Sequence, residues 1–206
     1  MRTRMSPEER QDQIVETARR LFDQHGYGAV DIEAIRKAAG LSRGGFYHHF
    51  GAKSDILARL ISAEVAAQAQ EIAVLPLRGA AALQALLGKG SVHGGADAGV
   101  LATISERDDR LIYLGYLEQA LHTHLRPLLV EMVTAGIASQ EFAPVAADHV
   151  ADLFLSTNAL INRRELLGEW SPEQSRAFAR TALSALGRLL DHPLDHVPGP
   201  TEESGA

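Results

Sequence analysis

The same helix-start signal occurs twice in this chain, at Ser6-Pro7-Glu8-Glu9 and at Ser171-Pro172-Glu173-Gln174. In each, a serine hydroxyl can accept from a backbone N–H, proline fits the first helical position, and the third residue after the cap can close a capping box. Apolar residues recur at spacings of three and four along the chain, and no run alternates with the period of a strand. The sequence therefore predicts an all-α fold.

Caps, glycines and prolines divide the chain into predicted helices. Pro127 lies inside one of them, so we expect a kink or a break there. The glycine-rich stretch 88–99 is expected to be a flexible connection, and the residues after Asp191 a frayed tail. The predicted helices run from the cap at Ser6 to His25, from Asp31 to Ala38, from Ser42 through Phe50, then over 52–75, 78–87, 97–106, 109–135 and 144–167, and from Ser171 to Leu190.

Composition excludes several classes of protein. The chain contains no cysteine, which rules out a disulfide scaffold, a thiol enzyme and a cysteine-ligated metal. It has no run of about 18 apolar residues, and the basic start is followed by Ser6-Pro7-Glu8-Glu9 instead of a signal-peptide core. We therefore expect no membrane association and a cytoplasmic location.

Charge is distributed unevenly along the sequence. Residues 1–58 hold nine Lys/Arg and eight Asp/Glu, whereas the remainder holds eleven and eighteen, within a net charge of −6. An acidic whole argues against non-specific coating of nucleic acid. It is compatible with a small DNA-reading head on an acidic body.

Residues 31–50 carry the pattern of a helix-turn-helix: two short helical segments joined by a three-residue turn that contains glycine. Gly40 permits the sharp reversal of the chain. Residues at the start of the second helix then protrude, where they can reach base edges in the major groove. The apolar residues expected to lock the two helices together are Ile32, Ile35, Leu41 and Phe46.

Side chains at and after this turn are the candidate DNA contacts. Arg43 is the long donor at the helix start, and arginine to guanine is the commonest specific base contact. Gly44 and Gly45 form helices poorly, which close approach of the backbone to DNA would explain. We expect Phe50 to be buried and Tyr47 to lie at the phosphate edge. The candidates are Ser42, Arg43, Gly44 and Gly45 at the helix start, and Tyr47, His48 and Lys53 as phosphate donors.

These residues resemble the signature of TetR-family transcriptional regulators over roughly residues 10–60. Small, aromatic and basic positions all fall at the family's spacing. The matching residues are Gly26-Tyr27, Ile35, the segment Ala39-Gly40-Leu41-Ser42-Arg43-Gly44-Gly45-Phe46-Tyr47-His48-His49-Phe50, Lys53 and Leu57.

The chain departs from the family's pattern at three positions. Val30 stands where the family usually has a threonine that contacts phosphate, and Gly45 where it has threonine or serine. Arg36 replaces a packed alanine, so it is either a further DNA contact or an exposed side chain. These departures affect the expected affinity for DNA and the expected preference among operator sequences, but not the expected fold.

The resemblance implies an N-terminal three-helix bundle with a helix-turn-helix and a larger C-terminal helical domain for ligand binding and dimerisation. The corresponding boundaries are 1–51, 52–191 and a disordered tail over 192–206. The last two long helices would pair two subunits in a four-helix bundle, placing two heads on a palindromic operator of double-stranded DNA. A small-apolar face suits that contact: Ala177, Phe178, Ala182, Ala185, Leu186, Leu189 and Leu190.

The resemblance also implies a small-molecule effector that binds in the helical body and shifts the dimer between DNA-competent and incompetent geometries. Apolar walls with a few phenol and amide groups favour a lipophilic or aromatic ligand. The candidate lining residues are Leu83, Leu87, Ile104, Tyr113, Tyr116, Phe154 and Asn158.

Two alternatives stay open at this point. Gly40-Leu41-Ser42-Arg43-Gly44 matches the G-x-S-x-G nucleophile elbow, so a serine hydrolase using Ser42 is the enzyme hypothesis, although the segment before it reads as helix. A helical small-molecule-binding module that does not bind DNA is the other. We expect no catalytic residue, no cofactor and no metal site, because neither His122/His124 nor His192/His196 forms a convincing ligand pair.

Overall fold

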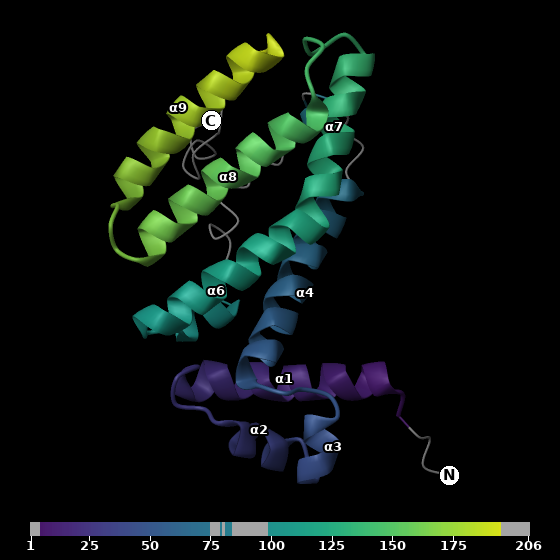
Figure 1. The fold of residues 1–206 in the computed structure, drawn as a ribbon, viewed down its shortest axis with the longest axis vertical. Coiled ribbons are helices and arrows are strands. Elements are labelled where there is room, and N and C mark those ends of the chain that lie inside the picture. The colour runs from purple at the N-terminus through teal and green to yellow at the C-terminus, as the bar shows by residue number, and fades with distance from the viewer. Residues whose placement is uncertain (1–4, 75–78, 80, 84–98, 195–206) are drawn as a thin grey trace, which may run out of the picture. The chain divides into compact units, whose positions relative to one another are not determined.

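The computed structural model describes residues 5–74, 79, 81–83 and 99–194, and within them every regular element is helical. The helices are α1 (Pro7–His25), α2 (Ile32–Ala38), α3 (Arg43–Tyr47), α4 (Lys53–Ala73), η1 (Gly99–Thr103), α6 (Arg107–Ala120), η2 (Leu121–Leu125), α7 (Arg126–Ala138), α8 (Ala147–Leu166) and α9 (Pro172–Leu190) (Figure 1). The predicted all-α fold is confirmed. None of the helices in these ranges is both long and apolar enough to cross a lipid bilayer.

The chain divides into two compact units, one of residues 1–64 with 97–117 and one of residues 65–96 with 118–206. The first unit extends beyond residue 51, where the helix-turn-helix motif ends. It also takes in η1 and the first part of α6. The three domain boundaries drawn from the sequence remain predictions.

The first unit is organised by α1, which packs against α2 and η1, while α2 and α3 lie together on one side of it (Figure 1). Both ends of α1 form as predicted: the Ser6 hydroxyl accepts from the Glu9 N–H, and Gly26 ends the helix with φ of 83°. Phe22 is fully buried, and its ring meets the Tyr27 ring edge-on at 5.0 Å. The fully buried Ile14, Ala18, Ile35, Phe46, Ile56, Leu57 and Leu60 complete this apolar core.

The second unit contains the α8–α9 hairpin with α7 packed on α8 (Figure 1). Trp170, in the connection, packs against Phe178 with ring centroids 5.1 Å apart and the ring planes tilted by 51°. Arg126 at the start of α7 forms two hydrogen bonds to Asp152 of α8, at 2.6 and 3.0 Å. This pairing lowers the pKa of Asp152.

The predicted long helix over 109–135 is interrupted before Pro127, as expected. Proline has no backbone N–H, and its ring crowds the carbonyl four residues earlier. Just before Pro127 the structure has the π-helical turn η2, in which the Arg126 N–H donates to the carbonyl of Leu121, five residues earlier. The regular α-helix then resumes as α7 and continues to Ala138.

Several predicted helix ends differ from the structure. Helix α3 ends at Tyr47 instead of Phe50, the structure describes the 3-10 helix η1 within the segment predicted as a helix over 97–106, and α6 begins at Arg107 instead of Asp109. Helix α8 begins at Ala147 instead of Pro144, because the Ala143 N–H bonds to the carbonyl of Leu190 and holds the preceding residues outside the helix. After Asp191 the chain does not fray at once: the His192 N–H bonds to the Gly187 carbonyl, and Leu194 is buried. The expected helix over 78–87, the flexible stretch 88–99 and the rest of the tail lie mostly or wholly outside the described residues.

Gly136 offers a test of packing in the second unit. A Cβ built on this buried glycine would overlap the Phe142 ring, so Gly136→Ala should destabilise the protein by about 1–3 kcal/mol. Gly115 on α6 has open space around its Cβ position, so Gly115→Ala should be neutral or stabilise by up to about 1 kcal/mol. Urea unfolding of both variants measures the difference, and equal stability of the two would show that the Phe142 ring is free to move.

Candidate nucleic-acid interface

The turn between α2 and α3 takes the geometry of a helix-turn-helix. Gly40 lies in the left-handed region with φ of 67°, which favours glycine. The Leu41 N–H bonds back to the Arg36 carbonyl at 3.1 Å. Ile35 and Phe46 are both fully buried, one from each helix, so the corner is fixed by its apolar interior. The predicted motif is present.

Helix α3 presents its polar residues outward from this corner. Ser42 caps the helix through a 3.1 Å hydrogen bond from the Gly45 N–H. Arg43 is exposed, and its guanidinium carbon lies 5.9 Å from the centre of the Tyr47 ring. Tyr47 is 44% exposed, and its position at the phosphate edge stays a prediction, whereas Phe50 is buried, as the sequence predicted. His48 is exposed beside them.

The two glycines of α3 have different surroundings. A Cβ at Gly45 would stand 3.1 Å from the Ser42 hydroxyl oxygen, so glycine at this position leaves room for the helix cap. At Gly44 nothing lies within 4 Å, so this face of the helix is open to an approaching molecule. For Gly44, close approach of the backbone to DNA stays a prediction. For Gly45, the room needed by the Ser42 cap already explains why a glycine stands there.

Arg36 is partly buried and makes hydrogen bonds within the protein, so it is not simply an exposed side chain, and its contact with DNA stays a prediction. Its Nε and one Nη donate to Glu33 at 3.0 and 2.8 Å, and the other Nη donates to the Leu41 carbonyl at 2.6 Å. Its side chain is 20% exposed. The hydrogen bond from Arg36 lowers the pKa of the Glu33 carboxyl. Arg36 therefore clamps the turn, which the sequence analysis missed although the i, i+3 spacing of Glu33 and Arg36 was visible.

Lys53 also makes contacts inside the protein. Its ammonium donates to the Tyr27 carbonyl at 2.9 Å and lies 4.1 Å from the centre of the Tyr27 ring. The lysine is partly buried, and the predicted phosphate contact would have to use its remaining N–H groups. Val30, the other departure from the family pattern nearby, is 3% exposed and belongs to the core.

Tyr27 connects this region to η1 and α6 within the first compact unit. Its N–H donates to the Thr103 carbonyl at 2.8 Å. Burial raises the pKa of its phenol to about 12, with smaller contributions from Asp109 and Tyr116. No pattern in the sequence marked this junction, because its partners are separated by more than seventy residues of chain.

The candidate ligand residues fall into separate groups. In the second unit, Leu83 and Phe154 line one apolar cavity of about 10 Å³, roughly the space of a single water. Asn158 is buried and accepts from the Asn162 side chain at 2.7 Å. Ile104, Tyr113 and Tyr116 belong to the first unit, and Leu87 lies outside the described residues. The effector site therefore stays a prediction.

The enzyme hypothesis fails on local structure. A nucleophile elbow needs a strand before the serine, whereas Ser42 follows α2, and its oxygen is used as a helix cap. Among the described residues, no three His, Asp or Glu side chains gather as they would around a metal ion.

The buried corner and the outward-facing α3 define a helix-turn-helix motif. Residues 14–60 match the family described as bacterial regulatory proteins, tetR family. The match falls on the region whose signature residues predicted a resemblance to this family.

Named relatives are similar to the chain over the same region. The HTH-type transcriptional repressor AcnR of Corynebacterium glutamicum is 35% identical over 66 residues, covering 32% of this chain and 35% of the relative. The HTH-type transcriptional regulator AcrR of Shigella flexneri is 37% identical over 59 residues, covering 29% and 27%. The chain thus spans about a third, or less, of the length of these curated relatives. They are transcriptional regulators, not enzymes.

Solved structures match over much more of the chain and show the fold. RolR in complex with resorcinol aligns with a TM-score of 0.67 and 17% identity, covering 94% of this chain and 96% of that one. GusR of Salmonella enterica aligns with a TM-score of 0.56 and 23% identity, covering 88% and 95%. At these identities the likeness shows the all-helical fold alone.

The clamp made by Arg36 can be tested by stability. Arg36→Ala removes the donor to the Leu41 carbonyl and should lower the free energy of unfolding by about 1–2 kcal/mol. Lys37→Ala, at the exposed neighbouring position, should change it by less than about 0.5 kcal/mol. Chemical unfolding of both variants provides the comparison. Equal free energies of unfolding would show that the hydrogen bonds of Arg36 do not stabilise the turn.

Proposed function

We propose that this protein is a ligand-responsive transcriptional regulator that binds DNA as a homodimer, and that it acts as a repressor released from a palindromic operator by a small lipophilic or aromatic molecule. The observation that carries the proposal is α3, a short helix anchored by the buried Phe46 that presents Arg43 outward. The cytoplasm, where such an operator is found, stays the predicted location.

Arg43 is proposed to read the bases. It is the exposed long-chain donor on α3, and its position beside the Tyr47 ring restricts the guanidinium before DNA arrives. Ser42, Tyr47 and His48 are exposed around it and can donate to phosphates on either side. The backbone at Gly44 offers the close approach, since no protein atom lies within 4 Å of its Cβ position.

The proposed dimer uses the α8–α9 hairpin. Leu153 of α8 is 51% exposed and Leu189 of α9 is 43% exposed, so each helix of the hairpin leaves a large apolar side chain partly in solvent. Pairing two such hairpins around a twofold axis would bury both leucines. It would also space two heads about 34–36 Å apart, or at a multiple of that distance, to match successive turns of DNA.

The proposed response to a ligand would act through the Tyr27 junction. The hydrogen bond from Tyr27 to Thr103 and the contact of Lys53 with Tyr27 tie η1 to the DNA-binding head. A ligand that binds one position of η1 and α6 better than another would shift the position of the head. Resorcinol is an aromatic ligand of the similar regulator RolR, and FrrA is described as flavonoid-responsive, which supports the ligand class proposed here.

Selection of bound fragments from random double-stranded DNA tests the proposal. We expect a palindromic motif to be enriched, and its complex to be released by one or more members of a panel of lipophilic and aromatic compounds. Failure to enrich any motif at low salt would favour the helical small-molecule module without DNA binding, an alternative that the buried Val30 keeps open because valine cannot contact phosphate as threonine does.

Arg43→Ala separates base reading from general affinity. The variant should lose preference at one base position of the half-site, at a cost of about 1–3 kcal/mol for the preferred base. Arg163→Ala, an exposed arginine on α8, serves as the control and should bind as the parent does. Competition binding against all four bases at each position measures the effect, and an unchanged preference would mean that another residue reads the operator.

A further inference from the structure

Glu33 is an acidic side chain at the edge of the proposed DNA-binding surface, whose candidate contacts are otherwise neutral or basic. It lies in the first turn of α2, and its side chain is 46% exposed. DNA carries a phosphate charge along its whole length, so a carboxylate placed against it weakens binding to every sequence unless it also makes a favourable contact. A carboxylate at this edge therefore either lowers affinity or selects among bases.

Arg36 holds the Glu33 carboxylate close to the point where α3 begins. The Arg36 Nε and one Nη both donate to Oε2 of Glu33, at 3.0 and 2.8 Å, and the other Nη donates to the Leu41 carbonyl at 2.6 Å. Because a guanidinium is rigid and planar, these three bonds keep the carboxylate about the width of one such group away from the Leu41 backbone. Ser42 and Arg43 follow Leu41 directly in the chain.

The second carboxylate oxygen of Glu33 faces no donor of its own chain. Both hydrogen bonds from Arg36 go to Oε2, and none of the described residues donates to Oε1. The bonds to Oε2 already restrict the rotamers of the side chain, so a further contact through Oε1 costs little conformational entropy. Glu33 is thus an exposed acceptor that is ordered before DNA arrives.

The carboxylate is ionised and lies within electrostatic reach of Arg43. The hydrogen bond from Arg36 is the largest effect that holds the pKa of Glu33 below its ordinary value. The positive charges of Arg43 and Lys37 act in the same direction, while desolvation opposes them. The surface around α3 therefore presents a fixed anion near the cation that is proposed to read the bases.

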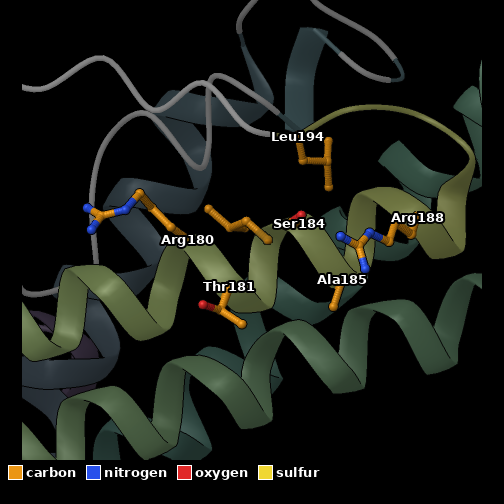
Figure 2. A pocket seen from close by; sticks show the side chains of 7 residues that line it. Arg180, Thr181, Ser184, Ala185, Arg188 and Leu194 are labelled. Atoms are coloured by element: carbon orange, nitrogen blue, oxygen red, sulfur yellow. The ribbon is translucent and has the colours of Figure 1, made fainter.

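Other exposed arginines of the chain do not have such a neighbour. Arg180 and Arg188 line a groove of about 540 Å³ on α9 in the second unit (Figure 2), and neither forms an ion pair with a described residue. An acid near Arg43 is therefore a local feature of the first unit, and not a rule for every exposed arginine of this acidic chain.

Cytosine is the base that suits a carboxylate in the major groove. Its N4 amino group donates there, whereas thymine presents O4, and guanine presents N7 and O6, which are acceptors that repel a carboxylate. A guanidinium favours guanine for the converse reason. An anion and a cation held near each other are therefore complementary to a cytosine and a guanine that lie near each other in the groove.

We propose that Glu33 is a specificity-determining residue, whose Oε1 accepts a hydrogen bond from the N4 amino group of a cytosine beside the guanine that Arg43 reads. This deepens the proposed function and rests on it, because it concerns the complex with DNA. The cost of placing a carboxylate near phosphates is offset at operators that carry this cytosine and remains at other sequences, which sharpens the discrimination between them.

Competition binding of Glu33→Gln, against all four bases at each position of the selected motif, tests this assignment. Glutamine keeps an acceptor for Arg36, but its amide can donate to thymine O4 as well as accept from cytosine N4. We expect the preference for cytosine over thymine at one position to fall about fivefold, while the guanine preference that depends on Arg43 is retained. Unchanged preference at every position would overturn the proposal, even if affinity rose for all sequences, because Glu33 would then only repel phosphate.

Glu33→Asp keeps the negative charge and shortens the side chain. It should lose the same cytosine preference, because the carboxylate is withdrawn by one methylene group while its repulsion of phosphate remains. Retention of the preference in this variant would show that the charge alone is responsible, and would count against a hydrogen bond from Oε1.

Glu16→Gln is the matched control. Glu16 is exposed on α1 and makes an ion pair of the same i, i+3 spacing, with Arg19 at 3.8 Å. The substitution removes one negative charge from the same unit and should leave every base preference unchanged. Far-ultraviolet circular dichroism of the three variants checks that they fold. Loss of the cytosine preference in Glu16→Gln as well would mean that net charge, and not the position of Glu33, sets the effect.

The inference and the proposed function fail in different ways. If selection enriches no motif, both fall together. If a motif is enriched and its base preferences do not depend on Glu33, the regulator stands and the role of Glu33 is discarded.

Discussion

The corner between α2 and α3 is the constraint on which the proposed DNA-binding interface depends. Ile35 and Phe46 are removed from water on its inside, and their burial fixes the angle at which α3 leaves the turn. Without that angle, Arg43 and its neighbours would be polar residues on a five-residue helix, too short to persist by itself. The direction in which Arg43 points is thus a consequence of apolar packing behind it.

The turn is reinforced by polar contacts that replace what the family pattern usually places there. Arg36 donates to the Leu41 carbonyl and to Glu33, so a charged side chain takes the position of a packed alanine without facing solvent. Similarly, the Lys53 ammonium donates a hydrogen bond to the Tyr27 carbonyl and makes a cation–π contact with the Tyr27 ring. Both residues are basic and lie next to the interface, yet their closest partners are within the protein. A positive charge near a DNA-binding helix is therefore not by itself a DNA contact.

The second unit combines two kinds of surface on its last helix. The side of α9 that carries Leu186 and Leu190 is buried, and the exposed side carries both an apolar residue, Leu189, and the arginines Arg180 and Arg188. The charged residues of α9 between Glu173 and Asp191 are all arginines, so the local charge of this stretch is opposite in sign to the net charge of the chain.

The sequence by itself determined the helices and the motif. Capping boxes at Ser6 and Ser171, the Ser42 cap and the break before Pro127 are local effects, and short-range hydrogen bonding and backbone sterics decide them. The tertiary structure alone decided the roles of Arg36, Lys53 and Tyr27 and the burial of Leu194, because each depends on which groups come into contact in the folded chain. Long, flexible side chains such as arginine and lysine can reach either DNA or a carbonyl of their own chain. Only the packed fold shows which carbonyl lies within reach.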